Sequence, residues 1–345
     1  MKLVSFKTLL LVLVFSLVTF LAACGNGADE TGGEEQGNGE EDTNSEDAAN
    51  ASGYPESSIE VVVPAGAGGD TDRNTRTLAR HLEDELGVNL VVQNVEGSGG
   101  SVGSREVMQG NADGYKALAF HDSALINSIL GLTEYSHQDF ELAGISVQDQ
   151  GNAFVVSADS QFEDLDDLVE YARENPGEVS VATETGAFTH LQLLALEEEA
   201  GIEFRIVDAG GASDKITALL GGQVDVVPTQ LGLVDEYLEA DEMRSVGVLS
   251  EERLDQFPEE ETFVEQGYDI VFNKNFFWAF PPETPEDVVN TFADAMETVI
   301  EENEDYRGEA EGHGVTPNFM GPEEAEQHLN EEKDYYQSIY EASGE

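Results

Sequence analysis

The chain has 345 residues, of which 72 are acidic and 15 basic, and its formal net charge is −57. This charge excludes a nucleic-acid partner, which requires a basic binding surface, and it opposes attraction to an anionic membrane surface. A single cysteine leaves no intramolecular disulfide and no cysteine-based zinc cluster. The hydrophobic fraction of 40% is nevertheless too high for a wholly disordered acidic chain, and the length is typical of about two domains.

The first 23 residues have the pattern of a secretory leader. Lys2 and Lys7 precede an uncharged run over residues 8–23, which is shorter than the roughly 20 apolar residues of a membrane-spanning helix. The run ends in Leu21-Ala22-Ala23-Cys24-Gly25, which is similar to the cleavage box of bacterial lipoproteins. We therefore predict a lipoprotein signal peptide at 1–23 and a lipid anchor on Cys24. The alternative is an ordinary signal peptide with an incidental cysteine.

Residues 24–53 are expected to form a disordered acidic tether. After Cys24 this segment contains no Lys, Arg, aromatic or large aliphatic residue, so it cannot bury enough surface to offset the entropy of ordering. Residues 25–58 contain ten acidic residues and no basic one. We expect the body that follows to be extracytoplasmic and anchored to the cell membrane through acylated Cys24.

From Tyr54 onward the pattern alternates between β-branched runs and amphipathic segments, which predicts α/β sheets with loops at the carboxyl ends of the strands. Strands are predicted at 59–64, 89–93, 116–120, 153–157, 179–183, 204–207, 224–227, 245–249 and 276–280. Helices are predicted to end near Gly87, Met108, Gly201 and Leu220, and to cover 124–127, 165–174, 231–238, about 285–302 and about 322–341. Asp70 or Thr71 is expected to cap the first helix.

Glycine-rich loops at 65–72 and 96–103 follow the first two strands. Loop N–H groups at a helix N-terminus form an anion site without any lysine. Neither loop has the lysine of a P-loop, and the dinucleotide pattern fails because Thr71 and Val102 occupy the third glycine positions. No cofactor is therefore expected.

The sequence offers little sign of catalytic or metal-binding motifs. No His-Glu-x-x-His occurs, and the single match to Gly-x-Ser-x-Gly, at 99–103, lies within the second glycine-rich loop; we do not expect an enzyme. Asp70 and Asp72 are better read as capping residues than as a cation site, and no metal is expected. His121 and His190 follow strand ends, where either a ligand contact or a structural hydrogen bond fits. What remains is a ligand-binding cleft between domains.

The order and spacing of several segments resemble the solute receptors of tripartite tricarboxylate transporters, the TctC or Bug-type family. The resemblance extends from about Tyr54 to the C-terminus. The segments that carry it are 54–55, 59–64, 67–72, 94–103, 112–115, Gly186 with 190–191, 210–211, 281 and 284–285, and above all Ala218-Leu219-Leu220-Gly221-Gly222-Gln223-Val224-Asp225.

The resemblance implies an α/β, two-domain, periplasmic-binding-protein-like (Venus flytrap) fold with a ligand cleft between the domains. Domain I would comprise 54–152 plus 278–345, and domain II 153–277. Family members hold small carboxylates largely through backbone N–H groups and waters. Carried over by position, the anion loop is 65–72, and the facing loops of domain II are 183–190 and 210–214. The residues expected to bind ligand are Ala65, Gly66, Ala67, Gly68, Gly69, Asp70, Thr71, Asp72, Gly99, His121, Ser123, Thr183, Thr185, Gly186, Ala187, Thr189, His190, Gly210, Gly211 and Asp214.

The sequence departs from the family pattern at the expected pocket. Ala65 replaces an aromatic residue that often follows the first loop proline, and Asp208 begins a segment that usually reads Tyr-Lys-Gly. Asp208 and Asp214 could repel a second carboxylate, bind an amine, or cap helices. Arg73 could reach a distal carboxylate, although we favour a surface residue that offsets nearby Asp.

The resemblance implies a monomeric, lipid-anchored receptor. It would capture a small organic carboxylate of the di- or tricarboxylate type and deliver it to a two-component membrane permease. The alternatives are a ligand-sensing lipoprotein that signals to a membrane kinase, and an exported hydrolase. A carboxylate receptor gains nothing from its strongly acidic charge, so we interpret the acidity as a halophilic surface suited to a salt-rich or alkaline medium.

This interpretation predicts how salt affects solute capture. The on-rate for an anionic solute should rise as salt is added from low ionic strength, because the screening length shortens to about 3 Å at 1 M and the repulsion by the surface is lost. Stopped-flow measurements at increasing NaCl concentration give this on-rate. An on-rate that falls with added salt would contradict the interpretation.

Overall fold

The computed structural model describes residues 53–344, which lie in one compact unit. The predicted signal peptide, Cys24 and nearly all of the tether lie outside the described residues. Within 53–344, no helix has both the length and the apolar character needed to cross a membrane.

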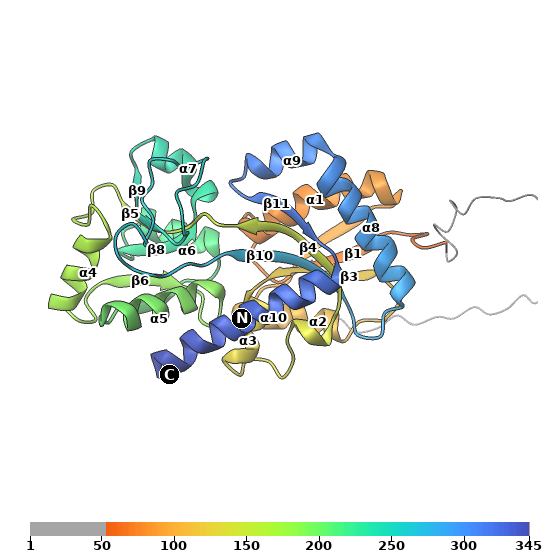
Figure 1. Cartoon of the computed structure of the whole chain (residues 1–345), viewed down its shortest axis with the longest axis horizontal. Helices are drawn as coiled ribbons and strands as arrows, with labels where there is room; N and C mark the ends of the chain where they lie inside the picture. Colours follow the sequence, from red (N-terminus) through yellow and green to blue (C-terminus); the bar gives the residue numbers. More distant parts are fainter. Residues whose placement is uncertain (1–52, 345) are drawn as a thin grey trace, which may run out of the picture. The chain divides into compact units, whose positions relative to one another are not determined.

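The elements alternate as the sequence predicts (Figure 1). Along the chain they are β1 (Ile59–Val63), α1 (Asp70–Leu86), β2 (Leu90–Asn94), α2 (Ser101–Met108), β3 (Lys116–His121), α3 (Ser123–Ile129), β4 (Glu141–Asp149), β5 (Asn152–Ser157), α4 (Leu165–Glu174), β6 (Ser180–Thr183), α5 (Phe188–Ala200), β7 (Arg205–Asp208), α6 (Ala212–Leu220), β8 (Val226–Gln230), α7 (Leu231–Glu239), β9 (Met243–Val248), β10 (Lys274–Phe280), α8 (Glu286–Glu302), α9 (Glu304–Glu311), β11 (Thr316–Met320) and α10 (Pro322–Ser343).

The strands form two mixed sheets, which confirms the predicted α/β class. The first sheet has the order β11-β4-β10-β3-β1-β2, and we call it with its helices lobe I. The second has the order β7-β6-β8-β5-β9 and belongs to lobe II. The chain crosses between the sheets twice, from β4 to β5 and from β9 to β10. The predicted boundary at 277/278 falls inside β10, which pairs with β3 and β4 of lobe I from Lys274 onward.

Both sheets have a parallel half. In lobe I, β2, β1 and β3 run parallel, and β10 pairs with β3 in the antiparallel direction. In lobe II, β7, β6 and β8 run parallel, and β5 pairs with β8 in the antiparallel direction. The carboxyl ends of parallel strands meet at one edge of a sheet, which is where open α/β sheets bind ligands.

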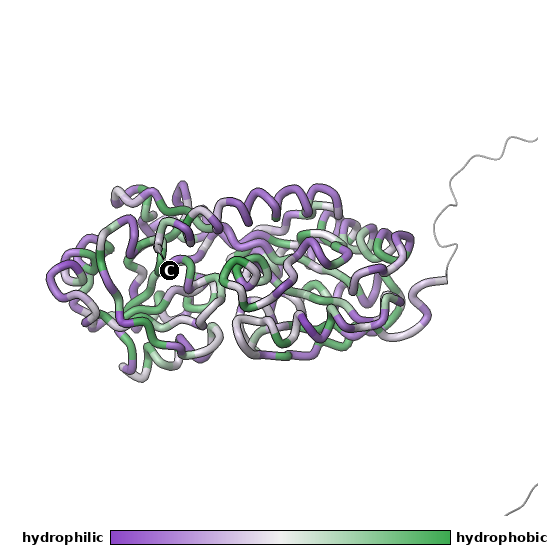
Figure 2. Tube along the Cα trace, turned by 90° about the horizontal axis from the view of Figure 1, so that it is seen from below, coloured by the Kyte–Doolittle hydropathy of each residue, from purple (hydrophilic) through white to green (hydrophobic). Residues whose placement is uncertain are grey.

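Alternating side chains of each strand bury opposite faces of the sheet. Val61 and Val63 of β1 belong to a core with α1, α8 and α9, whereas Val62 belongs to a core with α2, α3 and α10. The latter core continues into lobe II, where it includes residues of α4 and α5. Figure 2 shows hydrophobic residues along the interior and hydrophilic residues along the outer turns of the helices.

Two details of the prediction are wrong. Helix α1 begins at Asp70 with Gly69 as its N-cap and has no side-chain cap, so neither Asp70 nor Thr71 caps it. Helix α6 likewise begins after Gly211 without a side-chain cap, so Asp208 and Asp214 do not cap it either. In addition, β4, α9 and β11 were not predicted.

The last helix is tied to both lobes. Tyr336 of α10 stacks on Phe272, with ring centroids 5.8 Å apart, and its hydroxyl donates to Asp122 Oδ2 at 3.2 Å. The same Asp122 oxygen accepts from the backbone N–H of Asn275 at 2.9 Å. Burial and the neighbouring Glu332 carboxylate raise the pKa of Asp122. The buried carboxyl group thus joins the end of β3, the start of β10 and α10.

This network predicts a stability difference between two adjacent tyrosines. Tyr336→Phe removes a donor from a buried carboxyl group and should lower the free energy of unfolding by about 1–3 kcal/mol. Tyr335→Phe is the matched control, because Tyr335 is exposed and should change it by less than about 0.5 kcal/mol. Urea denaturation of both variants measures the difference. Equal losses would contradict the role given to the network.

Candidate functional site

The carboxyl edges of the two sheets surround a small cavity of about 50 Å³. Lobe I contributes the loop after β1, the end of β3 and the start of β10, which lies at the same edge because β10 runs antiparallel to β3. Lobe II contributes the loops after β6 and β7 and the end of β8. The cavity therefore lies where an open α/β sheet is expected to bind a ligand.

Glycines allow the loops of the two lobes to approach closely. A methyl group added at Gly69 would lie 3.7 Å from the Ala212 side chain, and one added at Gly211 would lie 3.8 Å from the Gly66 nitrogen. Gly99, which has a left-handed φ of 60°, would bring such a methyl group within 3.0 Å of the Gly186 carbonyl. Larger side chains at these positions would hold the lobes apart.

The N-termini of α1, α5 and α6 meet at the cavity, which is lined by Gly69, Asp70, Ala187, Phe188, Gly211 and Ala212. Each N-terminus carries unpaired N–H groups and a partial positive charge. Among the described residues, the backbone N–H groups of Gly66 and Gly211 have no protein acceptor. Asp72 holds the first loop in place, because its carboxylate accepts from Gly68 N and from Asn94 Nδ2, both at 2.9 Å.

A buried ion pair lies in the wall of the cavity. Lys274 Nζ is 2.5 Å from Asp70 Oδ2, and both side chains are buried. Although burial opposes ionisation, Lys274 and His121 hold the pKa of Asp70 below its ordinary value, and Asp70 and Asp149 hold the pKa of Lys274 above its own. The ammonium also lies 5.1 Å from the centre of the Phe188 ring. The two opposite charges of this pair neutralise each other.

His121 is neutral in this wall. Burial and the charge of Lys274 lower its pKa to about 3. Its Nδ1 accepts from the Ser123 backbone N–H at 3.2 Å, so the ring proton resides on Nε2. His121 therefore offers the cavity a donor without adding a charge.

Lys215 is a second buried lysine at the cavity. It lies in the first turn of α6, where a cation opposes the helix dipole. Its Nζ donates to Pro228 O at 2.8 Å and to Thr189 Oγ1 at 3.2 Å. No carboxylate among the described residues forms an ion pair with it. Burial and the charge of Lys274 lower its pKa to about 7.

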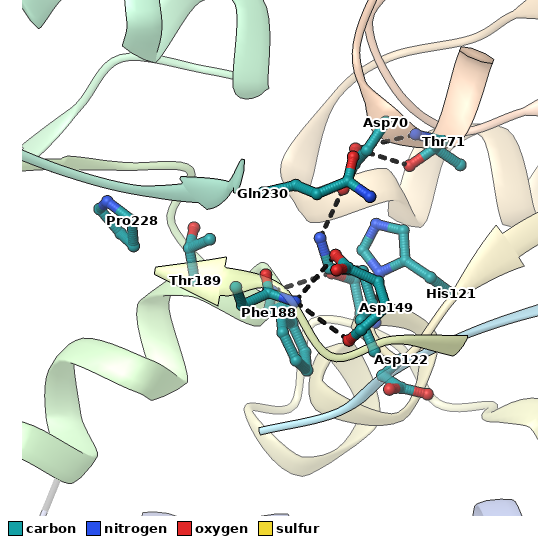
Figure 3. Close-up of polar contacts among 12 residues, drawn as sticks. Asp70, Thr71, His121, Asp122, Asp149, Phe188, Thr189, Pro228 and Gln230 are labelled. Carbon is teal, nitrogen blue, oxygen red and sulfur yellow. Dashed lines mark hydrogen bonds and ion pairs between the residues drawn. The ribbon is translucent and has the colours of Figure 1, made fainter. Parts of the chain in front are cut away.

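Two further polar groups at the cavity have no hydrogen-bond partner. Thr229 Oγ1 and Gln230 Nε2 are buried and unsatisfied, and both residues line the cavity. Gln230 extends toward Asp70 (Figure 3). A buried polar group without a partner destabilises the folded protein by about 1–3 kcal/mol, so such groups usually bind a ligand or a water.

A second hollow of about 280 Å³ adjoins the cavity and shares Ala65, Gly66, Glu184, Gly210 and Gly211 with it. Its remaining walls include Glu96 and Asp208, and no Lys or Arg lines it. Glu184 Oε1 accepts from Gly99 N at 3.1 Å, and burial raises the pKa of this carboxyl group. The adjoining hollow is thus acidic, whereas the cavity contains the unpaired ammonium of Lys215.

The residues expected to bind ligand fall into three groups. At the cavity lie Ala65, Gly66, Gly69, Asp70, Thr71, His121, Ala187, Thr189, Gly210 and Gly211. Gly99 and Thr185 line only the adjoining hollow. The others line neither. Ala67, Gly68 and Asp214 are exposed, and Asp72 supports the first loop. The remaining four form hydrogen bonds within the protein: Ser123 Oγ accepts from Phe188 N, the Thr183 hydroxyl bonds to that of Thr189, and Gly186 N donates to His190 Nδ1.

The sequence did not indicate four of the cavity residues, namely Lys215, Thr229, Gln230 and Lys274. Lys274 and Lys215 matter most, because the site was expected to use backbone N–H groups without any lysine. A signal existed for Lys215, since a lysine in the first turn of a helix is electrostatically unfavourable. Lys274 is the first residue of β10 and stands two residues before the apolar run Phe276–Phe280, where a charge is equally unusual.

Arg73 joins the lobes outside the cavity. Its guanidinium donates to Gln230 Oε1 at 2.8 Å and to Gly232 O at 2.9 Å in lobe II, and to His313 O at 3.0 Å in lobe I. The favoured reading of Arg73 as a surface residue paired with Asp is therefore wrong. It does not line the cavity either.

The polar groups of the cavity suit the binding of an anion. No group of three or more potential metal ligands occurs among residues 53–344. The cavity offers N–H, ammonium, amide and hydroxyl groups, which together can hold an anion.

The chain matches the family model described as "Tripartite tricarboxylate transporter family receptor" over residues 74–344. It belongs to this receptor family. Protein BugT of Bordetella pertussis is 29% identical over 238 residues, which cover 68% of this chain and 73% of BugT. The periplasmic binding protein BugD superposes with a TM-score of 0.78 at 25% identity, covering 84% of this chain and 99% of BugD. The Rpa4515 structure from R. palustris, which contains adipate, has a TM-score of 0.79 at 22% identity, covering 84% of this chain and 98% of that one.

The family comprises solute-binding receptors rather than enzymes, and its structures share the two-domain, periplasmic-binding-protein-like fold found in this chain.

The position of Arg73 predicts an effect on affinity. If the lobes separate to admit solute, the bonds from Arg73 to Gln230 and Gly232 must break, so Arg73→Ala should weaken solute binding by about tenfold or more. Arg80→Ala is the control, because Arg80 lies on the same helix with an exposed partner, Glu309. Isothermal titration of both variants with solute measures the two affinities. Unchanged affinity in Arg73→Ala would refute a closing role.

Proposed function

We propose that this receptor captures a small organic carboxylate between its lobes and delivers it to a two-component membrane permease of the tripartite type. The observation that carries the proposal is the cavity. Three helix N-termini, an unpaired buried lysine and two unsatisfied donors converge there. Each of these features stabilises a negative charge and would be costly without one.

Membership of the family supports the transport role, and the adipate in the Rpa4515 structure supports the ligand class by analogy. The di- or tricarboxylate type expected from the family is the starting hypothesis for the solute. Delivery requires a receptor whose surface differs between open and closed states, and the Arg73 contacts across the lobes offer such a difference.

The anchoring part of the proposal depends on the sequence around Cys24. The apolar run and the lipobox-like segment that ends it favour a diacylated, membrane-anchored receptor with an acidic tether. We further propose that the receptor acts as an extracytoplasmic monomer. Mass spectrometry of the mature N-terminus would identify the lipid, and an unmodified Cys24 would refute the anchor.

Titration of the soluble body with a panel of mono-, di- and tricarboxylates tests the ligand class. We expect at least one carboxylate to bind with an affinity in the micromolar range or tighter, as is usual for a largely pre-formed site. Failure of every carboxylate would refute the ligand class while leaving the fold untouched.

Gly69→Val tests the position of the site. The new side chain would enter the cavity wall between Gly66 and Ala212, so binding should be lost while the far-UV circular dichroism stays unchanged. Gly308→Val is the control. No neighbouring atom lies within 4 Å of a methyl group added at Gly308, and Gly308 does not line the cavity. Retained affinity in Gly69→Val would show that the loop after β1 does not hold the solute.

A further inference from the structure

The cavity is lined by four charged side chains, Asp70, Glu184, Lys215 and Lys274, and by the neutral His121. The Asp70 and Lys274 charges neutralise each other at 2.5 Å, and His121 is neutral. Of the two lysines at the cavity, Lys215 forms no ion pair with any described carboxylate, and its ammonium donates only to Thr189 Oγ1 and Pro228 O. A buried ammonium without a counter-charge is strongly unfavourable, so one negative charge from a solute would complete the cavity.

The groups that could receive that charge lie around Lys215. Its two protein acceptors, Thr189 Oγ1 and Pro228 O, leave the third ammonium proton unused. Thr229 Oγ1 and Gln230 Nε2 are unsatisfied at the end of β8, the strand that provides Pro228. These donors match the oxygens of one carboxylate.

The adjoining hollow would receive the other end of the solute. It shares five wall residues with the cavity, and its charged lining consists of Glu96, Glu184 and Asp208. None of these three carboxylates forms an ion pair. A second carboxylate placed there would meet three like charges, whereas an amine would meet three opposite ones.

Given the proposed function, we infer that the receptor selects solutes with one carboxylate, held by Lys215, and with an amine at the other end, held by the acidic hollow. This narrows the ligand class: a dicarboxylate of the same length is disfavoured. Lys215 is the specificity-determining residue at one end, and Glu184 and Asp208 are those at the other.

Matched solutes of equal length test the inference. The first set is succinate, butyrate and 4-aminobutyrate, and the second is adipate, hexanoate and 6-aminohexanoate. In at least one set we expect the aminocarboxylate to bind about tenfold or more tightly than the dicarboxylate, with the monocarboxylate between them. If the dicarboxylate binds as tightly as the aminocarboxylate in both sets, the inference is overturned. If no carboxylate binds at all, the proposed function itself fails.

Two variants separate the ends of the site. Lys215→Met, which keeps the length and loses the charge, should weaken every carboxylate by at least tenfold, whereas the control Lys116→Met should not, because Lys116 pairs with Glu60 and Glu106 away from the site. The double variant Glu184→Gln, Asp208→Asn should remove the preference for the amine and retain carboxylate binding. A preference that survives the double variant would overturn the role of the hollow.

The pH dependence gives a readout that a merely structural lysine would not. Lys215 is faced by Lys274 from β10, Asp70 from α1, His121 from β3 and Glu184 from the loop after β6. Because the pKa of Lys215 is near 7 in the free protein, Lys215 must take up a proton when a carboxylate binds above that pH. Affinity should then fall by up to about tenfold per pH unit above 7, and Lys215→Met should abolish the slope. If the pH dependence of affinity persists in Lys215→Met, it arises from another group and the role of Lys215 is overturned.

Discussion

The buried ion pair between Asp70 and Lys274 determines the electrostatics of the site. It joins the first residue of α1 to the first residue of β10, and so fixes the glycine loop of lobe I against a strand that returns from lobe II. Removing one partner of such a pair costs about 3–5 kcal/mol, because the other charge stays buried. Since the pair neutralises itself, the positive charge available to a solute comes from Lys215 in the opposite lobe.

This division explains how lobe closure and recognition are coupled. Lobe I supplies the loop after β1 and the neutral His121, and lobe II supplies Lys215, Thr229 and Gln230. A carboxylate in the cavity would contact both, so it would stabilise the closed arrangement that Arg73 also favours. The glycines at 66, 69, 99 and 211 permit the approach, since side chains there would fill the space between the loops. Recognition then depends on Lys215 and its neighbours in the cavity and on the carboxylates of the adjoining hollow, rather than on the net charge of the outer surface.

Local patterns predicted most of the fold. Helix α4 has the predicted bounds, and α1 and α5 end at the predicted glycines, because apolar periodicity and a left-handed C-cap are encoded within a few residues. The edge strand β11 was not predicted, since it is short, only partly buried and contains Pro317. Strand β4 lacks strict alternation, being almost wholly buried between β10 and β11.

The cavity was only partly predictable, because local patterns reveal the loops but not the long-range contacts that bring them together. Loops at the carboxyl ends of strands are evident from the chain order, so Gly66, Asp70 and Gly211 could be placed. Lys274 reaches the site through antiparallel pairing of β10 with β3, a contact between segments about 150 residues apart. Lys215 and Gln230 depend on how lobe II folds onto lobe I. Such long-range contacts leave little trace in local sequence beyond the placement of a charge where propensity disfavours it.

A crystal structure of the soluble body with a bound carboxylate tests the central claim most directly. We predict a carboxylate oxygen within hydrogen-bond distance of Lys215 Nζ, with the second oxygen near Thr229 or Gln230 and the ion pair of Asp70 and Lys274 intact. A carboxylate bound elsewhere, with Lys215 still bonded only to Thr189 and Pro228, would contradict the account.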